Sequence, residues 1–273
     1  MEEYNNKSKV GRFFAEVWRV VCYFVLFVGL QAGLILALIL VLSVVDAISG
    51  GNSVDNLNIS WGLFLSAVLT FILMKRRLGQ EWKEEGFWHY ERSLFSIILL
   101  CSCIGLALNL FINGVLCSLV TLGSEGQTER VMLGGESGNL FLAFVTTNFA
   151  IPVMEEIVFR GTMLRRLRET KLNWILALII QAVLFTSIHG MGIQGAYSFI
   201  LGIAFGLVYL WAGTIWASIA THIAFNAISD LFIWIYNTRC EGVSAGMWFV
   251  LALAGIGITI LLMSVLKRKC GFT

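Results

Sequence analysis

Apolar residues follow one another along this chain in runs without any Asp, Glu, Lys or Arg, and the lengths of these runs predict its elements. The uncharged runs cover 20–45, 56–74, 93–124, 137–154, 172–229 and 242–266. A helix needs roughly 20 apolar residues to cross the ~30 Å hydrocarbon core of a bilayer. Each run therefore reaches or approaches the length of a membrane-spanning helix, and the run at 172–229 is long enough for three.

The longest run has two internal breaks, one near Gly190–Gly192 and one near Trp211–Thr214. Glycine marks such breaks because it adopts backbone conformations that other residues avoid. The whole pattern predicts an all-α fold, a polytopic membrane bundle of about eight transmembrane helices. These helices are expected at about 20–46, 58–75, 94–122, 138–167, 173–190, 195–212, 214–236 and 246–266.

The composition supports this class and excludes others. The 273 residues are 58% hydrophobic and 13% charged, whereas a soluble domain carries roughly a quarter charged residues. A chain of this kind cannot cover a globular surface with solvated side chains. Disordered, collagen-like, disulfide-rich and nucleic-acid-binding proteins are also excluded. We therefore expect residues 1–273 to form a single membrane domain whose partners include the lipid bilayer and no nucleic acid.

Basic side chains orient the predicted bundle. They collect before the first helix, between the second and third, between the fourth and fifth, and after the eighth. If the eight helices alternate in direction, these four places lie on one side of the membrane, and only Arg130 and Arg239 remain on the other. The positive-inside rule then predicts a multi-pass protein of the cell membrane with both termini in the cytoplasm.

The fourth predicted helix carries Glu155, Glu156 and Arg160 where hydrocarbon is expected. A centred acid or Arg costs roughly 2.5–3.5 kcal/mol on insertion scales, so such residues usually face the bundle interior and serve a function. Glu156 and Arg160 lie one turn apart and can pair, while Glu155 points about 100° away around the helix. Pro152 predicts a kink that opens space beside Glu155. A purely structural ion pair is the alternative interpretation.

The fifth and seventh predicted helices contribute His189, His222 and, one turn further, Asn226. At 1.5 Å per residue, these side chains and Glu155 lie about 14–26 Å from the basic ends of their helices, within a band of about two turns. This spacing permits one polar site that opens toward the cytoplasm. It does not decide whether the side chains meet, since each His could be a hydrogen-bonded interior residue and the amide could join helices.

A carboxylate, two imidazoles and an amide are the groups that hydrolysis requires. A buried Glu can take a proton from water, and one His can share that water or protonate the leaving amine. The second His and the Asn can donate hydrogen bonds to a developing oxyanion. The HExxH zinc signature is absent from the sequence. A transporter is the alternative from another class, but it would need polar residues along a path through the other helices, whose interiors hold no acid or base.

Three motifs carry a resemblance to a known family. Pro152–Gly161 contains the pattern EExxxR, Phe185–His189 reads FxxxH, and His222–Asn226 reads HxxxN. All three occur in this order on successive predicted spans, over residues 152–226. In these motifs the chain resembles the CAAX-protease and bacteriocin-processing (CPBP, or Abi) family of intramembrane proteases. The resemblance implies an intramembrane endopeptidase.

The resemblance also implies a role for each motif residue. Glu155 would activate the attacking water together with His189, and His222 with Asn226 would form the oxyanion hole. Glu155, His189 and His222 could instead bind zinc in a His₂Glu arrangement with an open position. We favour the metal-free reading, with no cofactor, because a His and an Asn one turn apart suit paired donors. The site-supporting residues are Glu156 and Arg160.

The expected substrate is a membrane-associated peptide or protein. A cytoplasm-facing site beneath a basic and aromatic rim suits the precursor of a secreted peptide, such as a bacteriocin or a signalling peptide, or a lipidated C-terminus. Of these we prefer the precursor peptide. Relatives with this fold also serve as non-catalytic membrane scaffolds or bacteriocin-immunity proteins, and this is the alternative function.

Overall fold

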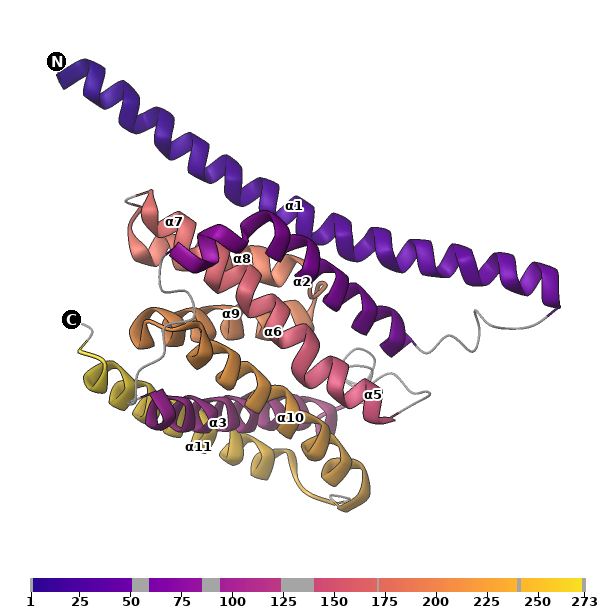
Figure 1. Cartoon of the computed structure of the whole chain (residues 1–273). Coiled ribbons are helices and arrows are strands. Elements are labelled where there is room, and N and C mark those ends of the chain that lie inside the picture. Colours follow the sequence, from indigo (N-terminus) through magenta and orange to yellow (C-terminus); the bar gives the residue numbers. More distant parts are fainter. Residues whose placement is uncertain are drawn as a thin grey trace. The chain divides into compact units, whose positions relative to one another are not determined.

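The structure is a computed structural model that describes residues 2–50, 59–84, 94–123, 140–170, 172–239 and 242–271. In these ranges every regular element is a helix (Figure 1). Six of the described helices are long and apolar enough to cross a membrane. The predicted all-α, polytopic membrane bundle is therefore confirmed.

The described helices match the eight predicted ones in number and order when the continuous helical stretch at 140–169 is counted once. The predicted starts at 58 and 138 lie outside the described residues. The elements are α1 (Glu2–Ser49), α2 (Ile59–Glu84), α3 (Leu94–Thr121), the stretch made of α5 (Leu140–Val145), the π-helix η1 (Thr146–Ala150), α6 (Ile151–Glu156), the π-helix η2 (Ile157–Leu164) and α7 (Arg165–Glu169), and then α8 (Trp174–Ser187), α9 (Ile193–Ala212), α10 (Ile215–Arg239) and α11 (Ala245–Lys269).

Two boundaries differ from the prediction by many residues. Helix α1 begins at Glu2 instead of near residue 20, and helix α2 continues to Glu84 instead of ending near residue 75, so both helices extend into charged segments. Helix α8 ends at Ser187, close to the predicted end near residue 190. The backbone φ angles of Gly190 and Gly192 are 87° and 80°, a region that favours glycine. These two residues turn the chain before α9 begins.

Helix packing divides the chain into two units, and each unit is made of two separate segments of sequence. Unit 1 comprises Met1–Glu85 and Ser137–Ala177, and unit 2 comprises Gly86–Glu136 and Leu178–Thr273. The boundary falls inside α8. The single membrane domain predicted for 1–273 stays a prediction.

In unit 1, α1 packs along α2 and along the helical stretch that carries the glutamates (Figure 1). A partly buried chain of polar side chains joins α1 to α2. The Ser66 hydroxyl donates to Gln31 Oε1 at 2.6 Å, and Gln31 Nε2 donates to Thr70 Oγ1 at 3.2 Å. Such bonds between spanning helices contribute about 0.6 kcal/mol each on average. They fix the register of the two helices.

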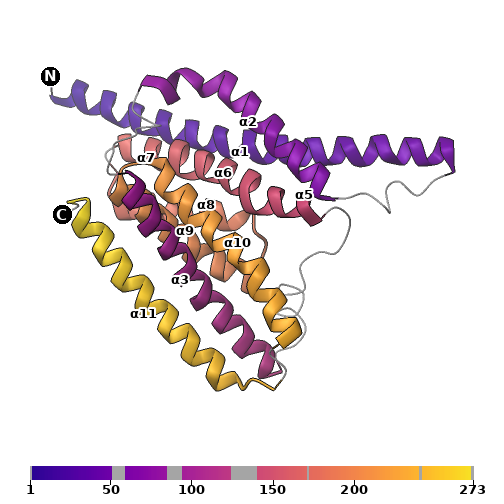
Figure 2. The same ribbon diagram turned by 60° about the horizontal axis from the view of Figure 1, so that its bottom comes forward.

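In unit 2, α3 lies side by side with both α10 and α11 (Figure 2). Small residues permit this packing. A Cβ atom added at Gly105 would lie 2.2 Å from the carbonyl oxygen of Thr221, and one added at Gly255 would lie 2.5 Å from the backbone nitrogen of Phe111. Close approach through small residues is typical of membrane helices, whose association depends on van der Waals contact. The backbone of α10 next to His222 is therefore held against α3.

Replacing Gly105 by alanine is expected to lower the free energy of unfolding by at least the usual ~1–3 kcal/mol of overpacking. The added methyl would meet the Thr221 carbonyl, a backbone group that cannot rotate away. The measurement is thermal unfolding of the detergent-solubilised protein. The control is Gly29→Ala on α1, where an added Cβ meets nothing within 4 Å. Equal melting temperatures for the two variants would contradict the close approach of α3 and α10.

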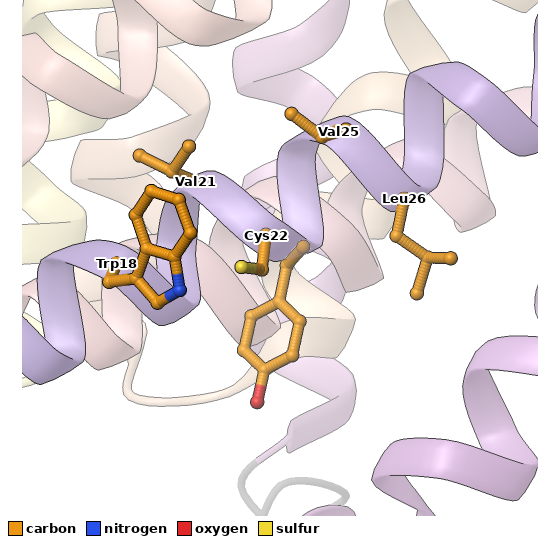
Figure 3. Close-up of a pocket in the computed structure, with 6 residues that line it drawn as sticks. Trp18, Val21, Cys22, Val25 and Leu26 are labelled. Carbon is orange, nitrogen blue, oxygen red and sulfur yellow. The ribbon is translucent and has the colours of Figure 1, made fainter.

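One face of α1 carries an apolar groove with a volume of about 350 Å³ (Figure 3). Trp18 and Val25 are 67% and 62% exposed, which suits side chains that contact acyl chains. None of the predicted site residues lines this groove. The lining residues are Trp18, Val21, Cys22, Tyr23, Val25 and Leu26.

Candidate active site

The glutamates stand on a helix whose hydrogen-bond register changes twice. Pro152 lacks an N–H group, and in an α-helix its ring collides with the carbonyl four residues earlier. The preceding segment η1 adopts the wider π register, in which the Ile151 N–H donates to the carbonyl of Thr146. The chain thus stays helical through the proline. Because π-helical turns are rare and occur frequently at functional sites, this geometry marks the segment that ends in Glu155 and Glu156.

A second π segment, η2, follows directly after Glu156. The Thr162 hydroxyl donates to the carbonyl of Ile157 at 2.9 Å, five residues earlier. The side chain of Phe159 is 0% exposed, and its ring meets those of Phe24 and Phe27 on α1 edge-on, with centroids 6.5 and 5.7 Å away. Aromatic contact with α1 therefore holds η2 in place within unit 1.

The expected ion pair forms between Glu156 and Arg160. Arg160 Nη1 lies 2.8 Å from Glu156 Oε1, and both side chains are 0% exposed. Removing one partner of such a pair leaves an uncompensated charge in a medium of low dielectric. The pair consequently locks the rotamers of both residues. Its site-supporting role stays a prediction.

Glu155 occupies the neighbouring position on α6 and is 7% exposed. Adjacent residues of a helix point about 100° apart, so the ion pair of Glu156 leaves the Glu155 carboxylate directed elsewhere. The same short helix thus carries one acid that is bonded to Arg160 and, at the adjacent position, a second acid that points in another direction around the helix.

His189 lies in the turn after α8, not inside a helix as the sequence predicted. Its backbone N–H donates to the Thr186 carbonyl at 2.9 Å, and its Nδ1 lies 2.8 Å from the carbonyl oxygen of Phe185. A carbonyl oxygen only accepts hydrogen bonds, so Nδ1 carries a hydrogen, and in the neutral form of the ring Nε2 is the acceptor. The bond to the backbone thus fixes the tautomer of the neutral imidazole and the orientation of its ring.

His222 lies on α10 in contact with two aromatic rings. The centroid of its imidazole is 4.7 Å from that of Phe205 and 6.1 Å from that of Phe185. Phe185 also contacts the ring of His189, at 4.3 Å. One phenylalanine of the FxxxH motif therefore contacts both histidines and brings them to the same part of unit 2.

Asn226 lies one turn after His222 on α10 and is half-buried. Two polar contacts with α3 hold this part of the helix. The Thr221 hydroxyl donates to the Cys101 carbonyl at 3.1 Å, and Asn109 Nδ2 donates to the Phe225 carbonyl at 2.9 Å. The His222–Asn226 turn is thus anchored from both of its neighbouring positions.

The predicted site residues form two half-sites. The first half-site, in unit 1, contains Glu155, Glu156 and Arg160, and the second, in unit 2, contains His189, His222 and Asn226. The structure brings together the ion pair in the first half-site and the two histidines around Phe185 in the second. Assembly of the two half-sites into one catalytic centre stays a prediction.

Sequence reasoning missed Phe205 as a neighbour of His222. Phe205 is fully buried, and its ring lies at 34° to the imidazole plane. The chain contains 20 phenylalanines, so no signal separated this one from the others.

One segment of the chain matches a known protein family. Residues 137–228 match the family model of Rce1-like type II CAAX prenyl endopeptidases. This Rce1-like segment contains all three motifs and draws on both units, so the resemblance predicted from the motifs is confirmed. No curated protein matches the chain in sequence. At a coarse level the match supports a CAAX-type intramembrane protease, and the six apolar helices indicate a multi-pass membrane protein.

Proposed function

We propose that this chain is an intramembrane endopeptidase that hydrolyses a peptide bond of a membrane-associated peptide or protein. The observation that carries the proposal is the Rce1-like match over 137–228, which contains EExxxR, FxxxH and HxxxN in order. The geometry of the second half-site supports it, because one phenylalanine holds both histidines and the backbone fixes the tautomer of His189.

In the proposed mechanism Glu155 and His189 activate water. The water donates one hydrogen bond to the Glu155 carboxylate and one to the Nε2 lone pair of His189. As its oxygen attacks the carbonyl carbon of the scissile bond, Glu155 takes the proton. The carbonyl π electrons move to the oxygen, and the bound carbonyl becomes an oxyanion.

His222 and Asn226 stabilise this oxyanion with N–H donors one helical turn apart. Collapse of the tetrahedral intermediate breaks the C–N bond, and Glu155 returns its proton to the leaving amine. The products are a carboxylic acid and an amine, so one water is consumed and no oxidant or reductant is required. Contact with the tilted ring of Phe205 restricts the orientation of the His222 imidazole.

Zinc is the alternative electrophile in this proposal. Glu155, His189 and His222 would hold it, and the bond from His189 Nδ1 to a backbone carbonyl is the kind that orients a metal-bound imidazole. These residue types suit zinc, which would lower the pKa of a bound water and polarise the scissile carbonyl, but the described residues contain no group of three His, Cys, Asp or Glu side chains placed to hold one metal ion. We favour the metal-free mechanism because Asn226, one turn from His222, matches a second oxyanion donor and is not a usual zinc ligand.

The experiment is digestion of a peptide library by the purified protein in lipid nanodiscs, read by mass spectrometry. The library contains unmodified apolar peptides, which represent secreted-peptide precursors, and peptides with a farnesylated C-terminal cysteine, which the family description suggests. We expect products with the wild type and none with Glu155→Ala. Products from both proteins would indicate a contaminating protease.

Dialysis against a zinc chelator separates the two mechanisms in the same assay. The metal-free mechanism predicts an unchanged rate and less than one zinc per chain by elemental mass spectrometry. A rate that falls on dialysis and returns with added zinc would establish the metalloenzyme. Absence of cleavage and of peptide binding would favour the non-catalytic scaffold or immunity protein.

A further inference from the structure

Two buried polar side chains of unit 2 have no hydrogen-bond partner among the residues that the structure describes. Gln181 on α8 is 0% exposed, and neither its Oε1 nor its Nε2 is bonded. Ser198 on α9 is 1% exposed, and its hydroxyl is also unbonded. Buried polar groups in native proteins are nearly always hydrogen-bonded, because leaving them unbonded forfeits their hydration. These two side chains thus indicate a missing partner.

Helices α8 and α9 run antiparallel and touch through small residues. A Cβ added at Gly202 would lie 3.0 Å from the Cβ of Ala182, and one added at Gly195 would lie 3.7 Å from Thr186 Cγ2. Residue numbers thus rise along one helix while they fall along the other. We call the line that joins Ala182 to Gly202 the contact line. The positions of other side chains on the two helices are counted from it.

Gln181 and Ser198 lie on the same side of this contact line. Counted from the contact residue of its own helix, Gln181 is turned by about −100° and Phe185 by about −60°. On α9, Ser198 is turned by about −40° and Phe205 by about −60°. Because the helices are antiparallel, rotations of equal sign point to the same side. Both phenylalanine rings contact His222, so this is the side that faces α10.

The two polar side chains are also level with His222 along the helix axes. Phe185 and Phe205 each lie three residues past the contact line, about 4.5 Å from it in opposite directions. A ring that contacts both, as that of His222 does, lies near the line itself. Gln181 is one residue and Ser198 four residues from the line, which is about 1.5 and 6 Å. By this count the unbonded amide and hydroxyl lie within about one helical turn of the imidazole along the helix axes.

We propose that Gln181 and Ser198 bind the main chain of the substrate, held as an extended segment beside His222. A glutamine side chain offers one acceptor and a paired donor, like a peptide group, and so it can form two complementary bonds to a peptide N–H and C=O. An extended peptide within the membrane itself lacks partners for these groups, so both sides gain by pairing. The inference rests on the proposed function, since it names what the second half-site holds.

The test compares Gln181→Leu and Ser198→Ala with the wild type on the best-cleaved peptide of the library. Each lost hydrogen bond is expected to raise KM about tenfold with little change in kcat, since the contact exists in the ground state and the transition state alike. The melting temperature of Gln181→Leu is expected to stay level or rise, because the folded protein loses no bond. The matched control is Gln31→Leu, which removes the bonded amide of α1 and should lower the melting temperature without changing KM.

Backbone-modified peptides identify the contact. Analogues of the same peptide, each with one N–H replaced by N-methyl, are titrated by fluorescence anisotropy into the inactive Glu155→Gln protein. We expect one position at which methylation weakens binding about tenfold, and at which adding Gln181→Leu produces little further loss. This non-additivity is the signature of a direct bond between the Gln181 amide and that peptide group.

The outcomes separate this inference from the proposed function. If Gln181→Leu and Ser198→Ala cleave and bind like the wild type, buried water satisfies both groups and the inference is wrong while the protease assignment stands. A raised KM with additive effects at every methylated position would also overturn main-chain binding. A wild type that neither cleaves nor binds any peptide overturns both. If Gln181→Leu fails to fold, Ser198→Ala carries the same comparison.

Discussion

Replacing Glu155 by glutamine is expected to lower the rate of peptide hydrolysis by about 10²–10⁴-fold, the usual contribution of a positioned general base. Glutamine has nearly the shape of glutamate but cannot accept the proton of the attacking water. The 2.8 Å contact with Arg160 is made by Glu156, so Glu155→Gln leaves that contact in place. The readout is the initial rate on the best library peptide, together with the melting temperature, which should not fall.

The adjacent residue supplies the matched control for this experiment. Glu156→Gln changes the same chemical group one position along the same helix, but it removes a charge that compensates the buried Arg160. Its melting temperature should therefore fall clearly. If Glu155→Gln retains the full rate, the role of Glu155 in activating water is wrong. If both variants behave alike in rate and stability, the two acids are not divided between catalysis and structure.

Replacing Arg160 by alanine is expected to lower the free energy of unfolding by about 3–5 kcal/mol. The guanidinium is 0% exposed and lies 2.8 Å from a carboxylate that is equally buried. Its removal leaves both a cavity and an uncompensated Glu156 charge. Thermal unfolding in detergent, followed by circular dichroism, measures the loss as a fall in melting temperature.

Two further variants separate charge from packing in this result. The double variant Glu156→Leu with Arg160→Met replaces the pair by apolar side chains of similar size, and it should recover most of the stability. Arg19→Ala removes an ion pair with Glu16. Its N···O distance is similar, 2.7 Å, but the arginine side chain is 52% exposed. Its effect should stay below about 1 kcal/mol. Equal losses for Arg160→Ala and Arg19→Ala would contradict a buried, desolvated pair.

The eight helices and the Glu156–Arg160 pair could be predicted from the sequence because both depend on simple spacing. An apolar run of sufficient length without charged residues predicts a membrane span. Two residues four positions apart on a helix are predicted to be neighbours. The location of His189 could not be predicted in this way, since the sequence places the break only approximately, near Gly190–Gly192, whereas the structure ends α8 at Ser187 and gives Gly190 a positive φ. A glycine in a sequence permits such a φ without requiring it.

The two π segments before and after the glutamates could not be predicted from the sequence either. Pro152 predicts a disturbance of the helix, but a kink, a break or a wider π register can each accommodate its missing N–H group. The structure selects the wider register before the proline and repeats it after Glu156. The contact of Phe205 with His222 depends on the packing of α9 against α10, which no local pattern encodes. Contacts between helices distant in sequence are thus the part that spacing rules leave open.

Because each unit is made of two separate segments of sequence, neither unit can assemble until its second segment has been synthesised. Asn109 of α3 bonds to the backbone of Phe225 and to the Ser229 hydroxyl on α10, and the first of these partners is 116 residues further along the chain. At about 5–20 residues per second, the ribosome delivers it roughly 6–23 s after Asn109 itself. During this interval α3 carries a polar amide toward hydrocarbon without its native acceptors. The membrane insertion machinery must therefore retain α3, or tolerate it alone, until α10 arrives.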